Sequence, residues 1–253
     1  MSLLPSAAAQ RNKDNYEADL EWIVKNLYSR FTSAQVILDI ALHGDKNVVI
    51  RPRAIPDPSP AEDDFSRFYN ATTTPSNVQD ALPAGETTST NKEEPWKDLI
   101  TGTGQGSDAL IEFNPGVYQD AMGVEPKDPS DHAFWVRQGR SDCVLLHELV
   151  HAMSDVSGVD ARTKSAPAGY NNLEEFTAVV ITNVYAAETS GGTPPLLSGR
   201  HDGRALPLLL RGSRPFYERY RTQMQDVCDN HRRLARQLKL ATGISHNPFV
   251  YCT

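Results

Sequence analysis

The sequence predicts a mostly helical α+β protein with one small sheet and a long irregular insertion. Apolar residues recur at helical spacing along most of the chain, which is typical of amphipathic helices. Two short runs rich in β-branched residues predict strands, and a polar segment rich in Pro, Ser and Thr lies between them. With 253 residues, 39% of them hydrophobic, the chain can build one sizeable core, so we expect a single domain over residues 1–253.

The N-terminal part predicts the order helix, helix, strand. Apolar residues at helical spacing mark a first helix over Asn15–Phe31. Thr32 and Ser33 can cap a second helix, which we expect to continue through Leu42. The run Asn47–Pro52 then has the Val and Ile content of a short strand.

The segment from about residue 53 to residue 96 differs in composition from the rest of the chain. Polar residues, Pro and Thr dominate it, so we expect a poorly structured insertion. Gly102, Gly104 and Gly106 follow it. No Lys-Ser/Thr pair comes after these glycines, as a phosphate-binding loop would require, so we interpret them as a turn that leads into a strand over Asp108–Phe113.

The second half of the chain predicts helices. One extends from about Ser141 to Ser154 and the next from about Asn172 to Glu188. A loop rich in Gly and Pro follows through Ser190–Arg204, and helical periodicity then continues from Pro215 to about Thr242. We expect these last helices to support the preceding pair.

The charge of the chain argues against a nucleic-acid partner. The formal net charge is −7 and the isoelectric point is near 5.5, whereas nucleic-acid binders usually carry a concentrated basic surface. Arginines do gather near the C-terminal end, but they alternate with apolar positions, which favours a solvated helix face. They are Arg211, Arg214, Arg219, Arg221, Arg232, Arg233 and Arg236.

The cysteines do not predict a disulfide-rich scaffold. Cys143, Cys228 and Cys252 cannot all pair within one chain, although one bridge is possible, and none shows CxxC spacing. No apolar run approaches the roughly 18 residues that span a bilayer, so we expect no stable membrane insertion. Met1–Pro5 also lacks the charged and long apolar regions of a cleavable signal peptide.

The run His147-Glu148-Leu149-Val150-His151 lies in an apolar stretch that predicts a buried helix. Histidines at positions i and i+4 project from one helix face, so both imidazoles can bind one ion. Zn²⁺ lowers the pKa of bound water from about 15.7 to about 7, and the offset Glu148 can take the proton during attack on a carbonyl. The apolar neighbours favour a metal, because unpaired polar groups are costly to bury. The pattern therefore predicts Zn²⁺ at both histidines with Glu148 as general base.

The third metal ligand stays open on residue patterns alone. A catalytic zinc site normally has three protein ligands, and Asp160 lacks the Gly-Thr-x-Asp context of an aspartate ligand. Glu174 and Glu175 on the next helix are better candidates, although either can instead form a capping box with Asn171 or Asn172. Glu174 lies nearer the apolar stripe of that helix and Glu175 nearly opposite. Since a helix that lines a cleft often places its ligand opposite its core-facing side, this difference does not decide between them.

Six segments carry a resemblance to a known family, and residues 53–96 are the part it covers least. The segments are Gly44–Ile50, His147–Ala152, Tyr170–Ala178, Asn183–Tyr185, Arg200–Gly203 and His246–Phe249. In this order they resemble the gluzincin-like metallopeptidase toxins of bacteria, such as the effector peptidases of type III secretion and the C-terminal metallopeptidase domains of type VI spike and Rhs proteins.

The resemblance implies a zincin-like fold with zinc at His147 and His151 and with Glu148 as general base. In clostridial neurotoxin light chains, which share the Glu-Glu arrangement, the second glutamate is the ligand. That favours Glu175 as third ligand, with Glu174 as the alternative. We therefore expect a zinc-dependent endopeptidase that acts as a secreted bacterial toxin or effector. The alternatives are a housekeeping zinc peptidase of the producing cell and a non-catalytic zinc-binding interaction module.

A toxin of this kind would be cytoplasmic in its producer and would leave the cell without a cleavable signal peptide. It would be delivered into a target cell, either into the periplasm of a bacterium or into the cytoplasm of a host cell. Its partners would be a protein or peptide substrate and, as the resemblance implies, a cognate immunity protein or a component of a secretion apparatus.

A hydrolytic site also needs a group that stabilises the tetrahedral oxyanion. His201 lies beside Asp202 in the Gly-rich loop and can swing toward a cleft. Tyr170 stands just before the helix that carries the two glutamates. Both residues are candidates, and a solvated loop side chain is the ordinary alternative.

Overall fold

The computed structural model describes residues 16–28, 32–53, 71–91, 94, 96–115, 135, 140–190, 194–198 and 205–253. The chain is α+β, as the sequence predicts, and its longer helices together with β1 (Val48–Arg51) and β5 (Ala109–Glu112) contribute to one hydrophobic core. After a helix over residues 16–28, the elements are α2 (Thr32–Leu42), β1 (Val48–Arg51), β2 (Thr72–Pro75), α4 (Val78–Ala81), β3 (Thr87–Ser89), β4 (Leu99–Thr101), β5 (Ala109–Glu112), α7 (Ser141–Ser157), α8 (Leu173–Thr189), η1 (Leu208–Leu210), α9 (Ser213–Arg219), α10 (Arg221–Asn230), α11 (Arg232–Leu240) and η2 (Pro248–Tyr251).

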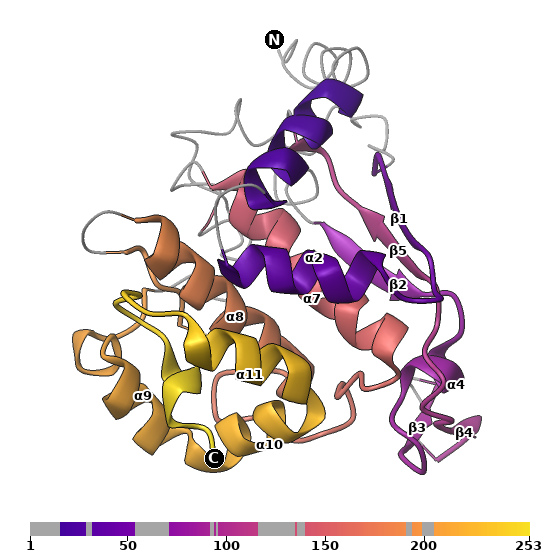
Figure 1. The fold of residues 1–253 in the computed structure, drawn as a ribbon. Coiled ribbons are helices and arrows are strands. Elements are labelled where there is room, and N and C mark those ends of the chain that lie inside the picture. The colour runs from indigo at the N-terminus through magenta and orange to yellow at the C-terminus, as the bar shows by residue number, and fades with distance from the viewer. Residues whose placement is uncertain are drawn as a thin grey trace, which may run out of the picture.

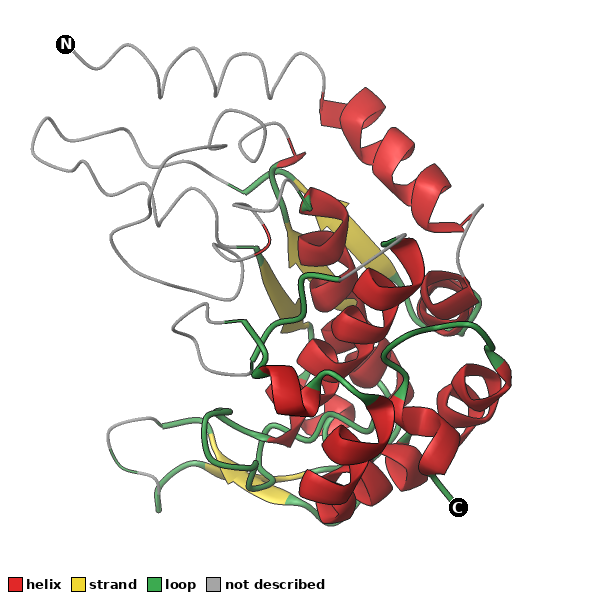
Figure 2. Ribbon diagram, turned by 90° about the vertical axis from the view of Figure 1, so that its left-hand side faces the viewer, coloured by secondary structure: helices red, strands yellow, loops and turns green. Residues whose placement is uncertain are grey.

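The main sheet has the strand order β1-β5-β2. The central strand β5 pairs in parallel with β1 and antiparallel with β2, so β2 forms one edge among the described residues. Figure 1 shows this sheet on one side of the molecule, α2 and α7 next to it, and α9, α10 and α11 on the far side. β3 and β4 form a separate antiparallel pair, which stands apart from the main sheet in Figure 2.

α7 packs against several other elements of the fold. The sheet lies against it through β2 and β5, while α2 and α8 also pack on it. Its middle residues, Val144–Leu146 and Leu149–Val150, are fully buried, which is why this apolar run forms an interior helix. The helix ends at Gly158, whose left-handed backbone (φ 65°) is the ordinary C-terminal signal.

The glycine turn before β5 packs directly on the end of α7. Gly106 has φ 76°, and a Cβ atom there would lie 2.1 Å from the carbonyl oxygen of Val156. A Cβ atom on Gly158 would meet the backbone of Gly104 at 2.5 Å. Two backbones can approach this closely only where side chains are absent, so these glycines join the turn to α7.

α8 lies antiparallel to α7, and side chains tie the two helices together at the end remote from the Glu174–Glu175 pair. The N-cap of α8 is Asn172, whose side chain accepts the N–H of Glu175 at 2.8 Å. At the other end, Arg140 pairs with Asp142 and donates to the Thr189 hydroxyl at 2.8 Å. Asp142 also accepts the Tyr185 hydroxyl at 2.7 Å.

The first turn of α2 receives its cap from α8. The carboxylate of Glu188 accepts the backbone N–H groups of Thr32 at 2.9 Å and Ser33 at 3.1 Å. It also accepts the Ser33 hydroxyl at 2.5 Å. Thr32 and Ser33 therefore begin the helix, as predicted, but a distant carboxylate supplies the capping oxygen atoms.

The C-terminal part forms three short helices where the sequence predicts continuous helical periodicity over residues 215–242. Each break has a non-helical residue, Tyr220 and His231, at the junction. The part is held by a disulfide between Cys228 and Cys252, so the chain contains the one bridge its cysteines allow, and Cys143 is free and buried. The arginines of α11 are exposed, as predicted for a solvated face.

The predicted insertion over residues 53–96 is more ordered than its composition indicates. Residues 71–91 form β2, α4 and β3, while residues 54–70 lie outside the described part of the chain. Strands can form from this polar composition because β2 pairs with β5 on one side only and β3 lies in a small, partly exposed pair with β4. None of the described helices is long and apolar enough to cross a membrane.

Candidate metal centre

His147 and His151 face each other across one turn of α7. Their Nε2 atoms lie 3.1 Å apart, and the two rings meet edge to face with centroids 4.8 Å apart. His147 is 3% exposed, while the side chain of His151 is 15% exposed. The spacing of four residues therefore places two ring nitrogens at one point, with access to solvent from the His151 side.

Glu175 completes the cluster from α8. Its Oε2 atom lies 3.4 Å from Nε2 of His147, and its Oε1 atom lies 3.6 Å from Nε2 of His151. Ligand atoms of the three residues all lie within 4.8 Å of one another, which makes them a group that could hold a metal ion. No other group of this kind was found among the described residues. The cluster thus offers two imidazole nitrogens and one carboxylate, the donor set of a catalytic zinc site.

Glu174 has a different place from its neighbour. Its Oε1 atom lies 3.2 Å from Nδ1 of His151, the ring nitrogen that points away from the cluster. Its Oε2 atom accepts the backbone N–H of Ala161 at 3.1 Å. A carboxylate on the outer ring nitrogen fixes the tautomer and orientation of a metal-binding histidine. The geometry thus separates the two glutamates that the sequence left open, with Glu175 at the cluster and Glu174 behind it.

Glu148 is held by a residue from the edge strand. The hydroxyl of Thr73 in β2 lies 2.6 Å from Oε2 of Glu148 and 3.0 Å from its backbone carbonyl oxygen. Glu148 is 3% exposed, so this hydrogen bond lies in a largely dry environment. Glu148 is therefore anchored through one carboxylate oxygen.

The charges around the two histidines favour a cation. Burial alone would lower the pKa of His151, but the negative charges of Glu175, Glu174 and Glu148 outweigh it and raise that pKa to about 10. Burial would likewise raise the pKa of Glu174, yet the hydrogen bond and charge of His151 hold it below its ordinary value. Three carboxylates around two imidazoles leave a mostly buried site short of positive charge. A proton on His151 or a divalent ion can supply it.

Asp160 belongs to a separate buried ion-pair network. Arg162 pairs with it and, at 3.2 Å, with Asp155. The backbone N–H of Arg162 also donates to Asp160 at 2.9 Å. Both aspartates are only 1% exposed, and Arg162 supplies one positive charge to the pair. Burial and the charge of Asp160 raise the pKa of Asp155 well above its ordinary value. The network accounts for Asp160 without a metal.

The two candidates for oxyanion stabilisation have different outcomes. The ring of Tyr170 packs edge-on against Phe176, with centroids 4.9 Å apart, and against Tyr220 at 6.2 Å. The structure thus places Tyr170 in an aromatic cluster at the beginning of α8. His201 lies outside the described residues. Tyr170 does not belong to the group that could hold a metal.

Two neighbours of the site were not predicted. Thr73 lies in a segment that its composition marks as irregular, although three consecutive threonines, Thr72–Thr74, have the β-branched character of a strand. His231, at the junction of α10 and α11, is 7% exposed and close enough to Glu174 to interact electrostatically with it. Burial keeps the pKa of His231 below its ordinary value. No local sequence pattern identifies this residue.

Cys143 lies one turn before His147 and takes no part in the cluster. It is fully buried in the core, and burial raises the pKa of its thiol well above the ordinary value. It is therefore a neutral side chain of the core.

Comparison of the chain with models of protein families, with curated proteins and with solved structures gave no match.

Proposed function

We propose that this protein is a zinc-dependent endopeptidase. The observation that carries the proposal is the convergence of His147, His151 and Glu175, with Glu148 buried beside them. Two histidines, a glutamate and an adjacent second glutamate form the set used by zinc peptidases with a His-Glu-x-x-His helix. Glu175 would complete the ligands, and Glu148 would serve in proton transfer.

The residues fit Zn²⁺ by number, type and charge. His147 and His151 would hold it through Nε2, and Glu175 would hold it through a carboxylate oxygen. Glu174 would keep His151 oriented through Nδ1. When bound in such a site, zinc acts as a Lewis acid and lowers the pKa of water to about 7.

Proton transfer is the task of Glu148. Its Oε2 atom accepts the Thr73 hydroxyl at 2.6 Å, and its carboxylate would accept a proton from the attacking water. The same carboxyl group can then donate that proton to the leaving amine of the peptide. Because Thr73 fixes one oxygen, it limits rotation of the carboxylate and keeps the other in place.

The position of β2 supports an extended peptide as substrate. β2 is an edge strand among the described residues, and its Thr73 contacts the proposed general base. An edge strand presents unpaired backbone N–H and C=O groups, which can pair with an added strand. A peptide that pairs with β2 would run past Glu148, which would place one of its carbonyl groups near the three ligands.

The toxin or effector role is also a proposal and rests on the resemblance of the sequence to bacterial metallopeptidase toxins. A disulfide between Cys228 and Cys252 is compatible with delivery into an oxidising compartment such as the periplasm. Of the two target compartments, the bridge favours this one over a host cytoplasm.

The proposed function is tested with purified protein and the variant Glu148→Gln. The native protein should contain one Zn²⁺ per chain and should cleave an unstructured protein such as casein in a chelator-sensitive way. The variant should keep its zinc and lose at least about a hundredfold in cleavage rate, because it cannot accept a proton. Full cleavage by the variant, or native protein that binds no zinc, would overturn the proposal. A protein that binds zinc but cleaves no peptide of a library would instead be an interaction module.

A further inference from the structure

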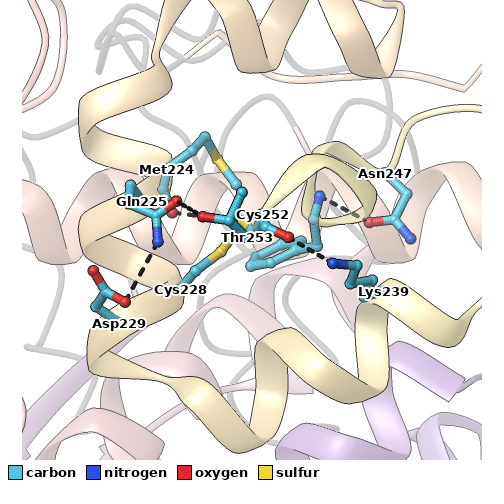
Figure 3. Close-up of a disulfide and its surroundings, with 9 residues drawn as sticks. Met224, Gln225, Cys228, Asp229, Lys239, Asn247, Cys252 and Thr253 are labelled. Atoms are coloured by element: carbon cyan, nitrogen blue, oxygen red, sulfur yellow. Dashed lines mark hydrogen bonds between the residues drawn. A yellow bond between two sulfur atoms is a disulfide. The ribbon is translucent and has the colours of Figure 1, made fainter.

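A second site candidate lies in the C-terminal part, away from the metal cluster. A cavity of about 420 Å³ opens between α10, α11 and the last residues of the chain. Arg232, Arg236 and Lys239 line it from α11, Cys228 and Asp229 line it from α10, and Cys252 and Thr253 line it from the last residues. A disulfide joins Cys228 to Cys252 at its wall. Figure 3 shows Lys239 pointing from α11 toward Cys252, across from Asp229. The volume of this cavity is in the range of binding sites for small molecules.

The cations of this cavity are arranged in a row. Arg232 and Arg236 are one helical turn apart, and Lys239 follows three residues later, so all three project from the same side of α11. Lys239 donates to the backbone oxygen of Cys252 at 2.7 Å, which keeps its ammonium group at the wall. Asp229 is the one acidic side chain that lines the cavity. The lining therefore carries more positive than negative side-chain charge.

The two arginines have no acidic partner among the described residues. The ion pairs of the C-terminal helices involve Arg214 and Glu218, not Arg232 or Arg236. Asp229 accepts a hydrogen bond from Gln225 at 3.4 Å and forms no ion pair within the described part of the chain. Like charges one turn apart on a helix are destabilising, so this row has a cost that an anionic ligand would remove. The chain as a whole is acidic, with a net charge of −7, which makes the local excess of cations more notable.

We propose that this cavity binds a small phosphorylated ligand through Arg232, Arg236 and Lys239. Two guanidinium groups can each donate paired hydrogen bonds to phosphate oxygens, while the ammonium group supplies a third positive charge. A ligand with two phosphate groups offers these three cations more charge and more acceptor oxygens than a single phosphate does. The assignment is independent of the proposed peptidase activity, because no residue of the metal cluster lines the cavity.

The experiment measures binding of pyrophosphate and of inorganic phosphate to the oxidised full chain by isothermal titration calorimetry at low ionic strength. Pyrophosphate should bind more tightly than phosphate, and added salt should weaken both. The double variant Arg232→Gln/Arg236→Gln should bind pyrophosphate at least about tenfold more weakly. Arg233→Gln is the matched control, because Arg233 is an exposed cation of the same helix that does not line the cavity, and it should bind as the native protein does.

Further arms separate the sources of such a ligand. Sedimentation with phosphatidylcholine vesicles that contain a phosphatidylinositol bisphosphate tests for a lipid headgroup, and titration with pyrophosphate tests for a free metabolite. Sensitivity to the double variant in either arm supports the site and identifies its source. Equal weakening by Arg233→Gln and by the double variant would reduce the site to a diffuse basic surface. That result, or no binding in either arm, would overturn the proposal.

Discussion

Oε1 of Glu174 lies 3.2 Å from Nδ1 of His151, on the side of the ring opposite the atoms that face His147. The neighbouring Glu175 instead approaches the Nε2 atoms of both histidines. Two adjacent glutamates therefore have separate tasks, one that orients a histidine and one that would bind the metal. This division can be tested directly, because substitution of Glu174 and substitution of Glu175 should weaken zinc binding by different amounts.

Zinc affinity should fall after either glutamate is removed, but by different amounts. Glu174→Ala leaves all three ligands in place and should weaken zinc binding by about 10- to 100-fold, the range for loss of an orienting carboxylate. Glu175→Ala removes a ligand and should weaken it further. Competition with a chromophoric chelator measures both constants. If Glu174→Ala had the larger effect, the roles given to the two residues would have to be exchanged.

Thr73 should affect cleavage without affecting zinc. Thr73→Val keeps the shape of the side chain and removes the hydroxyl that lies 2.6 Å from Oε2 of Glu148. A hydrogen bond to a charged group contributes about 1.5–3 kcal/mol, so kcat should fall about 10- to 100-fold. Steady-state kinetics and zinc content of the same preparation are the measurements. Thr73→Ser, which restores the hydroxyl, should recover most of the rate, and failure to do so would assign Thr73 a packing role only.

The disulfide should stabilise the folded protein substantially. Cys228 and Cys252 are 24 residues apart. Closing a loop of that size lowers the entropy of the unfolded chain, which raises the free energy of unfolding by about 3.5 kcal/mol. Urea unfolding of native protein with and without dithiothreitol measures this difference. The variant Cys228→Ser/Cys252→Ser should resemble the reduced protein and should not respond to reductant. A response by that variant would mean that the effect of the reductant arises elsewhere.

His246 should make the protein sensitive to mild acid. It is fully buried, Nδ1 lies 2.9 Å from the carbonyl oxygen of Arg211, and the ring packs against Phe216. Burial lowers the pKa of His246 to about 4, below the value of about 6.5 in an unfolded chain. As the pH falls, His246 therefore takes up a proton in the unfolded state at a higher pH than in the folded state. The contribution of the neutral, buried His246 to folding stability is complete above pH 6.5 and is lost as the pH falls toward 4. The loss at pH 4 is about 3 kcal/mol.

The measurement is the free energy of unfolding as a function of pH. Between pH 7 and pH 4, the free energy of unfolding should decrease less in His246→Gln than in the native protein, whatever the absolute stability of the variant. His43→Gln is the control, since the side chain of His43 is 67% exposed. A pH dependence that is the same in native protein and in His246→Gln would contradict the assignment.

Local rules predicted the parts of the site that lie within one helix. The spacing of His147 and His151 is a property of the α-helix, and the apolar neighbours of the motif determine that α7 is buried. The two helices that carry the cluster were predicted to within a few residues at their ends. The sequence left Asn171 and Asn172 open as the cap of the second helix, and the structure has Asn172 there. The α+β class followed from the same periodicity.

The relationships between helices and strands were not predictable in this way. α8 is buried on nearly all sides, so a helical wheel has no single solvent face by which to separate Glu174 from Glu175. The contact of Thr73 with Glu148 depends on the pairing of β2 with β5, between segments far apart in the chain. His231 reaches Glu174 because of how α10 and α11 pack. Each of these relationships depends on tertiary packing, which residue spacing alone does not encode.

The bond from the backbone N–H of Ala161 to Glu174 has a consequence for redesign of the protein. It anchors the start of the connection between the two ligand helices at the carboxylate that orients His151. The helices are thus kept in place by this anchor and by their own packing, not by the length of the connection. Residues 165–169 could accordingly be lengthened or exchanged to reshape the approach to α8 while His147, His151 and Glu175 keep their positions.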